Sequence, residues 1–385
     1  MLVSNLPSSL YGALSTTLGF DVTVSSWLYA AYFATLVPSL LAAGRIRERV
    51  RPAVLLRSGL ALCLAGEILS AVAGSAAGIG VARALQGIVV GVLSVFLSSL
   101  ALHSAPVRGV GLSAGSTLIG GIVGPAIGAC WIAFDRAEPS GAFGIAVVLI
   151  AAVLAASFFV RLPVAPLSAR SVQRVAWRDA PREGRRAVLA GCLSSVAAWT
   201  SAGLVLGLLT NVLPAALPTA PQWLAPVLVT SVMTMALGTQ LGIGRLLPSG
   251  SRVPLAFAGT VASTLGASLL AAGLWTGSTP LVVVAVVAIG CGLGAGFLGG
   301  LRLVSAVRAE LPSGLDRFFL LSYVAAGAPA LVVGLLGIAI DSVSALGLVL
   351  LTSAVTTWGT TALLSRTFRQ TPLFADPVAR RSPSG

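Results

Sequence analysis

The sequence has no lysine, one histidine and few charged residues of either sign. Its 385 residues include 24 basic residues, all of them arginine, and 11 acidic ones, so that 9% are charged and 56% are hydrophobic. A soluble domain carries about a quarter charged residues. Because no water-soluble fold could bury this much apolar surface, the composition excludes a soluble globular protein and predicts a membrane protein.

The scarcity of histidine and cysteine limits the chemistry that side chains can supply. The four cysteines lie inside apolar runs without a CxxC pair, as expected of small packing residues. His103, the sole histidine, has no second histidine or acid at ligand spacing. We therefore expect no metal, no cofactor and no enzymatic activity. The least favoured interpretation is a membrane-embedded enzyme or a transporter-like protein without transport.

Apolar runs of membrane-spanning length follow one another along the chain. Arginine, proline, glycine or acidic residues separate them, and each run is near the ~20 residues that cross the hydrocarbon. The predicted fold class is an all-α polytopic membrane protein with 12 transmembrane helices. The predicted spans are residues 1–20, 23–44, 52–73, 77–102, 107–132, 141–161, 187–210, 223–245, 253–275, 279–305, 318–340 and 343–365.

The arginines fall on alternate connections between these spans. With both termini inside, the inner connections hold nearly all of them, whereas Asp21, Asp135, Glu138 and Asp341 fall outside together with Arg136. This asymmetry follows the positive-inside rule. It explains the net charge of +13 without a nucleic-acid partner. We expect a multi-pass protein of an inner (plasma) membrane of bacterial type, with both termini cytoplasmic.

A polar, arginine-rich stretch divides the chain near its middle. We expect it to be a solvated cytoplasmic linker, with an amphipathic helix on anionic lipid as the alternative. A weak repeat, GRI at 44–46 and GRL at 244–246, supports two pseudo-symmetric halves, and such repeats are common in secondary transporters. The predicted parts are a six-helix bundle (1–162), the linker (163–186), a second six-helix bundle (187–365) and a cytoplasmic tail (366–385).

The segment GRIRERVRP at 44–52 resembles a degraded Gly-x-Leu-x-Asp-Arg-x-Gly-Arg-Arg signature of the major facilitator superfamily, and the resemblance to that superfamily covers nearly the whole chain. Glu48 stands where the family has Asp, and the second Gly is missing. The resemblance implies a gating motif that latches against the start of the eleventh helix, where a carboxylate favours a helix N-terminus and arginines bridge carboxylates. Ordinary positive-inside charge is the alternative. The residues of this motif are Gly44, Glu48, Arg49, Arg51 and Asp316.

The segment RALQG at 83–87 matches the family's Arg-x-x-Gln-Gly in the fourth helix. Arg83 lies deep in a span, where a charge is costly without a partner, and Glu67 in the third helix is expected at a similar depth. Apolar surroundings disfavour a charge on Glu67 whereas Arg83 favours it, so that protonation would uncouple the pair. Arg83 and Glu67 are thus candidates for proton coupling, with a static ion pair as the alternative.

The segment GGIVGPAIGA at 120–129 resembles the Gly-x-x-x-Gly-Pro-x-x-Gly-Gly motif of the drug–proton antiporters, with Ala129 replacing the last Gly. Proline bends a helix and glycine lets a neighbour approach closely. The resemblance implies the antiporter, or multidrug efflux, branch and favours export. The matching positions are Gly120, Gly124, Pro125 and Gly128.

Polar and aromatic residues on the helices that face the centre in this family are candidates for the substrate cavity. Interhelical hydrogen bonds or an interfacial position are the alternatives for many of them. A lining this apolar suits amphiphilic or neutral solutes. The candidates are Asn5, Tyr11, Trp27, Tyr32, Gln86, Ser116, Trp199, Thr200, Met233, Thr234, Gln240, Ser322 and Tyr323.

Together these features predict a monomeric secondary transporter that exports a small organic solute, drug-like or a metabolite, by alternating access with proton coupling. Its partners are expected to be membrane lipid, a small-molecule substrate and a proton. The alternative is a facilitator or importer of a small neutral solute without proton coupling.

Overall fold

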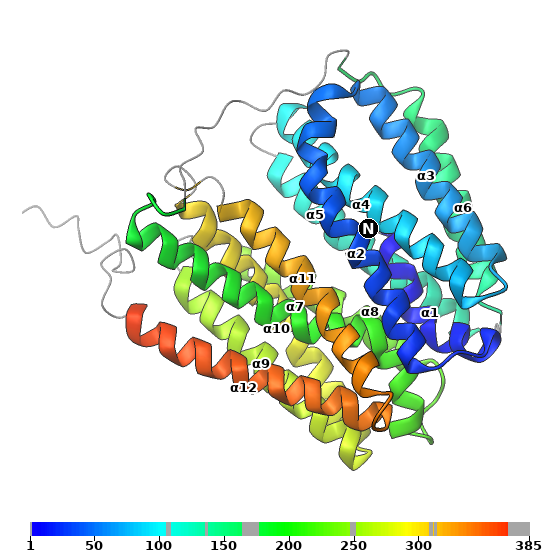
Figure 1. Cartoon of the computed structure of the whole chain (residues 1–385), viewed down its shortest axis with the longest axis vertical. Helices are drawn as coiled ribbons and strands as arrows, with labels where there is room; N and C mark the ends of the chain where they lie inside the picture. Colours follow the sequence, from blue (N-terminus) through cyan, green and yellow to red (C-terminus); the bar gives the residue numbers. More distant parts are fainter. Residues whose placement is uncertain are drawn as a thin grey trace, which may run out of the picture. The chain divides into compact units, whose positions relative to one another are not determined.

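The computed structural model describes residues 2–104, 109–134, 138–163, 177–246, 252–307, 311 and 314–368 (Figure 1). These residues form twelve α-helices and no strand, which confirms the predicted fold class. The helices are α1 (Leu2–Leu18), α2 (Val22–Arg49), α3 (Pro52–Val72), α4 (Ala76–Ser104), α5 (Gly109–Ala133), α6 (Ser140–Ser157), α7 (Arg182–Ala216), α8 (Leu224–Leu246), α9 (Arg252–Thr276), α10 (Thr279–Ala306), α11 (Gly314–Leu336) and α12 (Ser342–Phe368).

Nine helices among the described residues are long and apolar enough to cross a membrane. Two more, α5 and α12, contribute the shorter apolar stretches Ile119–Ala133 and Ser342–Trp358. The sequence placed the helices correctly but not all of their ends. Helix α2 continues to Arg49, through the gating segment, and α7 begins at Arg182, inside the predicted linker.

Local sequence signals explain where several helices begin and end. The Asp21 carboxylate accepts a hydrogen bond from the Val24 amide at 2.9 Å and so caps the exposed N–H groups of α2. Proline opens α3 at Pro52, where its missing N–H costs nothing. Gly19 and Gly277 follow α1 and α9 with φ of 68° and 64°, a conformation that glycine adopts without a Cβ clash.

The chain forms two compact units. Unit 1 comprises Met1–Ser171, Leu204–Met233 and Gly327–Ala345, and unit 2 comprises Val172–Gly203, Thr234–Ala326 and Leu346–Gly385. Unit 1 therefore contains α1 to α6 together with one end of each of α7, α8, α11 and α12.

In unit 1, glycines bring helix backbones into contact. A Cβ added at Gly87 or Gly91 would collide with the backbone of α2, and one added at Gly124 would collide with the Leu2 carbonyl of α1. The face of α4 that carries Gly87 and Gly91 thus packs closely on α2, because small residues on one helical face let a neighbouring backbone approach. Helices α3 and α6 run side by side in Figure 1.

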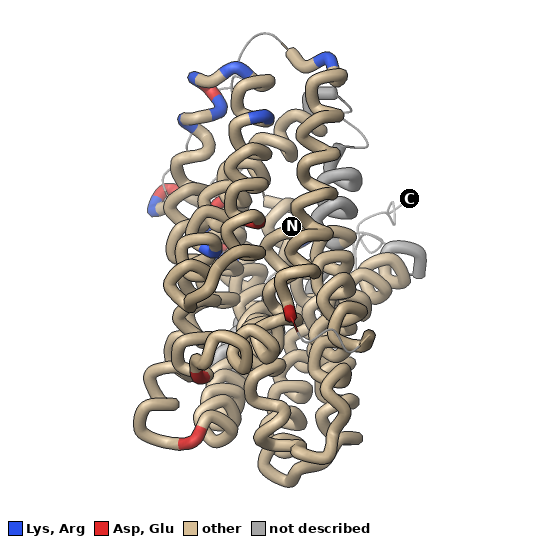
Figure 2. Tube along the Cα trace, turned by 90° about the vertical axis from the view of Figure 1, so that its right-hand side faces the viewer, with Lys and Arg blue, Asp and Glu red and all other residues tan. Residues whose placement is uncertain are grey.

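The charged positions distinguish the two ends of unit 1. Few of them interrupt the long uncharged helices in Figure 2. The last turn of α2 carries Arg47 and Arg49, next to Arg51, and we call this the Arg end. Asp21 begins α2 at the opposite end, and Asp341 lies there too, because Gly337 in the same segment approaches Thr23. We call this the Asp end.

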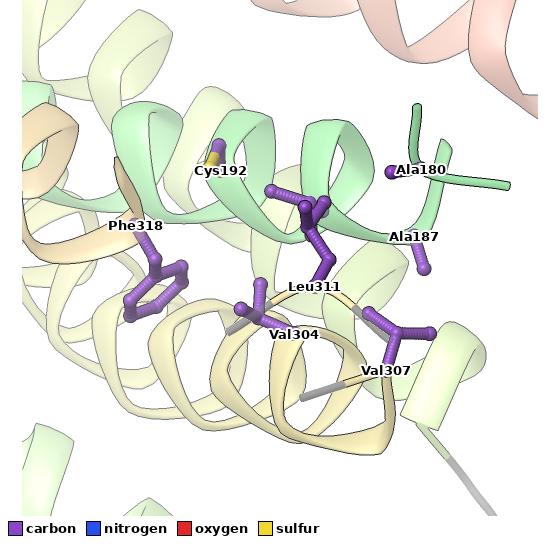
Figure 3. Packing of buried hydrophobic residues seen from close by; sticks show 8 residues of the cluster. Ala180, Ala187, Cys192, Val304, Val307, Leu311 and Phe318 are labelled. Carbon is purple, nitrogen blue, oxygen red and sulfur yellow. The ribbon is translucent and has the colours of Figure 1, made fainter. Parts of the chain in front are cut away.

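In unit 2, α9 and α10 are the closely packed pair. A Cβ at Gly259 would collide with the backbone at Gly296, and one at Gly299 would collide with Ala256. A second contact lies at the start of α7, where apolar side chains of α7, α10 and α11 point toward one another (Figure 3). The residues of this cluster are Ala180, Ala187, Val188, Cys192, Val304, Val307, Leu311 and Phe318.

Candidate functional site

Three polar side chains form a chain of hydrogen bonds inside unit 1. Arg83 on α4 donates from Nη1 to Gln86 Oε1 at 2.7 Å and to the Ser4 carbonyl of α1 at 2.9 Å. Gln86 in turn donates from Nε2 to Glu67 Oε1 on α3 at 2.5 Å. Glu67 and Gln86 have no exposed surface and Arg83 is 1% exposed. The Arg83 guanidinium also lies 4.6 Å from the centre of the Tyr32 ring of α2.

The sequence positions these groups through simple helix geometry. Arg83 and Gln86 are three residues apart and share one face of α4. Because a short connection joins α3 to α4, Glu67 and Arg83 come to similar depths in two antiparallel helices. The sequence pairs Arg83 directly with Glu67, whereas in the structure Gln86 lies between them. The amide reaches both partners, so the contact between the two charges is indirect.

Part of this cluster lacks hydrogen-bond partners among the described residues. The buried atoms without a hydrogen bond of good geometry are Glu67 Oε2, Arg83 Nε and Nη2, and the Tyr11 hydroxyl, which nevertheless lies close enough to Arg83 to interact with it. A buried charge with incomplete partners is costly, and a half-satisfied network is the costliest arrangement. The cluster is therefore suited to exchange one set of partners for another.

The Tyr32 ring on the guanidinium belongs to a group of aromatic rings on α1 and α2 that contact one another. The ring centres of Tyr11 and Tyr29 are 6.4 Å apart, those of Tyr29 and Phe33 5.1 Å, and those of Tyr32 and Phe33 4.8 Å. Aromatic faces stabilise a buried cation. Tyr29 and Phe33 were absent from the predicted site, although their spacing with Tyr32 on one helix could have indicated them.

Helix α5 packs against the helix that receives the Arg83 hydrogen bond. Gly124 lies against the α1 backbone, and Gly128 lies against Ser9 and Leu10 of the same helix. Pro125 is buried inside α5, and Gly120 is partly exposed. The antiporter-like motif thus forms the contact of α5 with α1.

Helices α7 and α11 pack on α1 and α2 in unit 1. Gly207 of α7 lies against the Tyr29 ring, and Gly327 of α11 lies against the Phe33 ring. The Thr210 hydroxyl of α7 donates to the Ser8 carbonyl of α1 at 3.4 Å. Asn211, which was absent from the predicted site, has both amide atoms buried without a described partner. An amide inside an apolar run was the available signal.

The other predicted cavity residues are spread over both units. In unit 1, Asn5 is partly exposed, Trp27 is 50% exposed and Met233 is buried beside Gly121. The side chain of Ser116 lies outside the described residues.

In unit 2, the Ser195 and Ser322 hydroxyls share a hydrogen bond of 2.5 Å. The Trp199 ring lies 6.0 Å from the Phe297 ring, and its Nε1 is buried without a described partner. Thr200 is buried, Gln240 and Tyr323 are partly exposed and Thr234 is exposed.

The predicted gating motif is exposed at the Arg end. Glu48, Arg49 and Arg51 are exposed, and Asp316 is exposed in the first turn of α11. Among the described residues, no atom lies within 4 Å of a Cβ built at Gly44. Asp316 belongs to unit 2 and the other four residues belong to unit 1. The latch between them therefore stays a prediction. Nowhere in the described residues do three or more His, Cys, Asp or Glu side chains gather as metal ligands would.

Comparisons with known proteins are consistent with this architecture. A family model described as Major Facilitator Superfamily matches residues 1–312. No curated protein sequence matches the chain.

Solved structures match at low sequence identity. A mutant of the nucleoside transporter NupG has a TM-score of 0.72 at 13% identity, over 95% of this chain and 97% of NupG. A POT family transporter in complex with 5-aminolevulinic acid has a TM-score of 0.69 at 14% identity, over 95% of each chain. A bacterial homologue of the human lysosomal transporter Spinster, inward-facing and unoccupied, has a TM-score of 0.69 at 13% identity, over 96% of this chain and 94% of the other. At such identities these likenesses show the fold alone.

Proposed function

Because this chain belongs to the Major Facilitator Superfamily and is a multi-pass membrane transporter of that type, we propose that it exports a small organic solute by alternating access, driven by proton entry. Glu67 is the proton-binding group, and Arg83 is the cation that responds to its charge. The family points to transport rather than to an enzyme.

The observation that carries this proposal is the incomplete set of partners around Glu67 and Arg83. A carboxylate and a guanidinium buried among apolar helices cost several kcal/mol unless they are paired. Here one carboxylate oxygen and two guanidinium nitrogens are unpartnered among the described residues. Protonation of Glu67 removes one of the two buried charges, and Arg83 then gains from other acceptors. A purely structural ion pair would be more stable with these hydrogen-bonding atoms paired.

The location of the cluster connects it to movement. Arg83 holds α1 through the Ser4 carbonyl and lies on the Tyr32 ring of α2. Both helices also pack against α7 and α11 in unit 1. A change in the charge of Glu67 therefore acts on the helices that must separate for the Asp end to open.

The direction and setting of transport form the remainder of the proposal. Export is supported by the resemblance of Gly120, Gly124, Pro125 and Gly128 to the antiporter motif. The distribution of arginine supports a plasma membrane with both termini cytoplasmic. A monomer that carries amphiphilic or neutral solutes completes the proposal, with Glu48 and Arg49 latching toward Asp316 on the cytoplasmic side.

Transport in proteoliposomes tests the proposal. A thermal-shift screen with nucleosides, neutral antibiotics and lipophilic dyes selects a probe, whose flux is then measured with and without an imposed pH gradient. One pH unit corresponds to about 1.4 kcal/mol, so that exchange of one proton per solute supports up to about tenfold accumulation. Glu67→Gln should reduce this ratio to about one while downhill movement of the probe continues.

The matched control is Glu138→Gln, which neutralises an exposed carboxylate in the same unit and should retain the dependence on the gradient. Wild-type dependence in Glu67→Gln would eliminate Glu67 as the coupling group. Movement of the probe in wild-type vesicles that ignores the gradient would favour the alternative, a facilitator or importer without proton coupling.

A further inference from the structure

Gln86 connects the two buried charges through opposite atoms of one amide group. Its NH₂ group donates to Glu67 Oε1, and its carbonyl oxygen accepts from Arg83 Nη1. The side chain has no exposed surface, so water cannot take the place of either partner. The orientation of this amide is therefore determined by Glu67 and Arg83.

Only one amide orientation satisfies both neighbours while Glu67 is ionised. A carboxylate can only accept hydrogen bonds and a guanidinium can only donate them. The amide must then present its NH₂ group to Glu67 and its oxygen to Arg83, as it does in the structure. The reverse orientation would place two donors face to face and two acceptors face to face.

A proton on Glu67 changes this requirement, because the acid gains an O–H donor. On Oε2 that donor would be buried without an acceptor among the described residues, which costs about 1–3 kcal/mol. Directed at Gln86, it needs the amide oxygen, so the amide must turn. Its NH₂ group then faces Arg83, and the hydrogen bond between Gln86 and Arg83 breaks.

We propose that Gln86 is a positioning residue that relays the protonation of Glu67 on α3 to Arg83 and, through Arg83, to α1 and α2. The relay rests on the proposed function, since it assumes that Glu67 takes up the proton. When the amide turns, Arg83 loses its acceptor on Gln86, and its hydrogen bond to the Ser4 carbonyl and its contact with the Tyr32 ring weaken.

The charged groups that act on Glu67 are Arg83 and the α-amino group of the chain. The titratable groups near the cluster are Cys63 on α3 and Tyr11, Tyr29 and Tyr32 on α1 and α2. Helix α6, which packs against α3, has no titratable side chain. Glu67 is the buried acid whose charge changes beside Arg83, and the Glu67→Gln variant distinguishes its effect from that of the α-amino group.

The relay has a readout that needs no substrate, namely hydrogen–deuterium exchange of the α1 backbone (Leu2–Leu18) in the purified full-length protein. Exchange is measured over a range of pH at labelling times corrected for the intrinsic rate. In the wild type, α1 should exchange faster as pH falls, because Arg83 releases it. In Gln86→Met we expect this pH dependence to vanish. If that variant does not fold, Gln86→Leu serves as a second apolar variant.

Ser70→Ala is the matched control, since Ser70 is a buried polar residue of α3 whose hydroxyl bonds only to the Gly66 carbonyl of its own helix. It should retain the wild-type pH dependence. One outcome would overturn the relay and leave the proposed function intact: the exchange of α1 still depends on pH in Gln86→Met but no longer does so in Glu67→Gln. Survival of the pH dependence in Glu67→Gln would overturn both, and pH-independent exchange in the wild type would overturn the relay.

Discussion

The two compact units solve the same packing problem but bury different polar groups. Unit 1 encloses Glu67, Arg83 and Gln86, whereas the fully buried polar residues described in unit 2 are serines and threonines, beside the buried atoms Trp199 Nε1 and Arg302 Nη1. The Ser194 hydroxyl of α7, for example, lies 3.0 Å from both the Ala256 and the Gly296 carbonyl oxygens and shares its one proton between them. Helix α4 of unit 1 carries a buried arginine, whereas α10 of unit 2 carries glycines that pack on α9 and a partly exposed arginine, Arg302.

This difference in buried polar groups shows which of them can respond to a proton. A hydroxyl that donates to a backbone carbonyl of its own or a neighbouring helix has one low-cost geometry and no charge to lose. A buried acid and base change partners when one proton moves, and the cost of burying them is paid throughout the cycle. Under the proposed function, unit 1 therefore holds the group that responds to protons, whereas the buried hydroxyls of unit 2 connect helices.

The largest effect is expected where this difference is removed. Arg83→Met leaves Glu67 buried without its charge partner, which costs about 3–5 kcal/mol. Ser194→Ala in unit 2 removes one hydroxyl and costs about 1 kcal/mol. The apparent melting temperatures of the purified variants in one detergent compare the two. Equal melting of both variants would break the comparison, whereas recovery of stability in Arg83→Met combined with Glu67→Gln would sharpen it.

Packing through glycine should be alike in the two units. Gly124→Ala drives a methyl group into the Leu2 carbonyl in unit 1, and Gly259→Ala drives one into the backbone at Gly296 in unit 2. Each should lose about 1–3 kcal/mol through overpacking. Gly144→Ala is the control, because nothing lies near a Cβ at that position. A stable Gly259→Ala variant beside an unstable Gly124→Ala variant would show that the units pack differently.

The smallest effect concerns a helix cap. Hydrogen bonds from Ser344, chiefly from its side chain and also from its backbone N–H, hold the pKa of the exposed Asp341 carboxyl below its ordinary value of 3.8. By accepting the backbone bond, the carboxylate caps α12. A depressed folded-state pKa stabilises above the unfolded-state pKa and loses its effect as pH falls through the folded-state value. Asp341→Asn should therefore lower the melting temperature slightly and constantly from about pH 7 to about pH 5, with a shrinking difference below about pH 4.

In unit 2 the comparison for this prediction is Ser278, which precedes α10 without a side-chain capping bond. Ser278→Ala should leave the melting temperature unchanged. A loss equal to that of Asp341→Asn would show that the cap carboxylate contributes nothing specific to unit 1.

Sequence reasoning identified the members of the polar cluster better than their connections. Arg83, Glu67 and Gln86 were all named, because polar residues stand out in apolar runs. The order in which they bond was not foreseen, since it depends on which rotamers fit between α3 and α4. Tyr29, Phe33 and Asn211 were missed because an aromatic or amide residue in a membrane helix has several ordinary positions.

The sequence by itself determined that this protein is a twelve-helix membrane transporter, because the length of each apolar run, the placement of arginine and the family motifs are local or additive properties. Only the tertiary structure decided that Gln86 stands between the two charges and that Gly207 and Gly327 meet the rings of Tyr29 and Phe33. Such contacts join residues far apart in the chain, and they depend on helix rotation and depth, which the hydrophobic pattern of a helix buried on most sides does not specify.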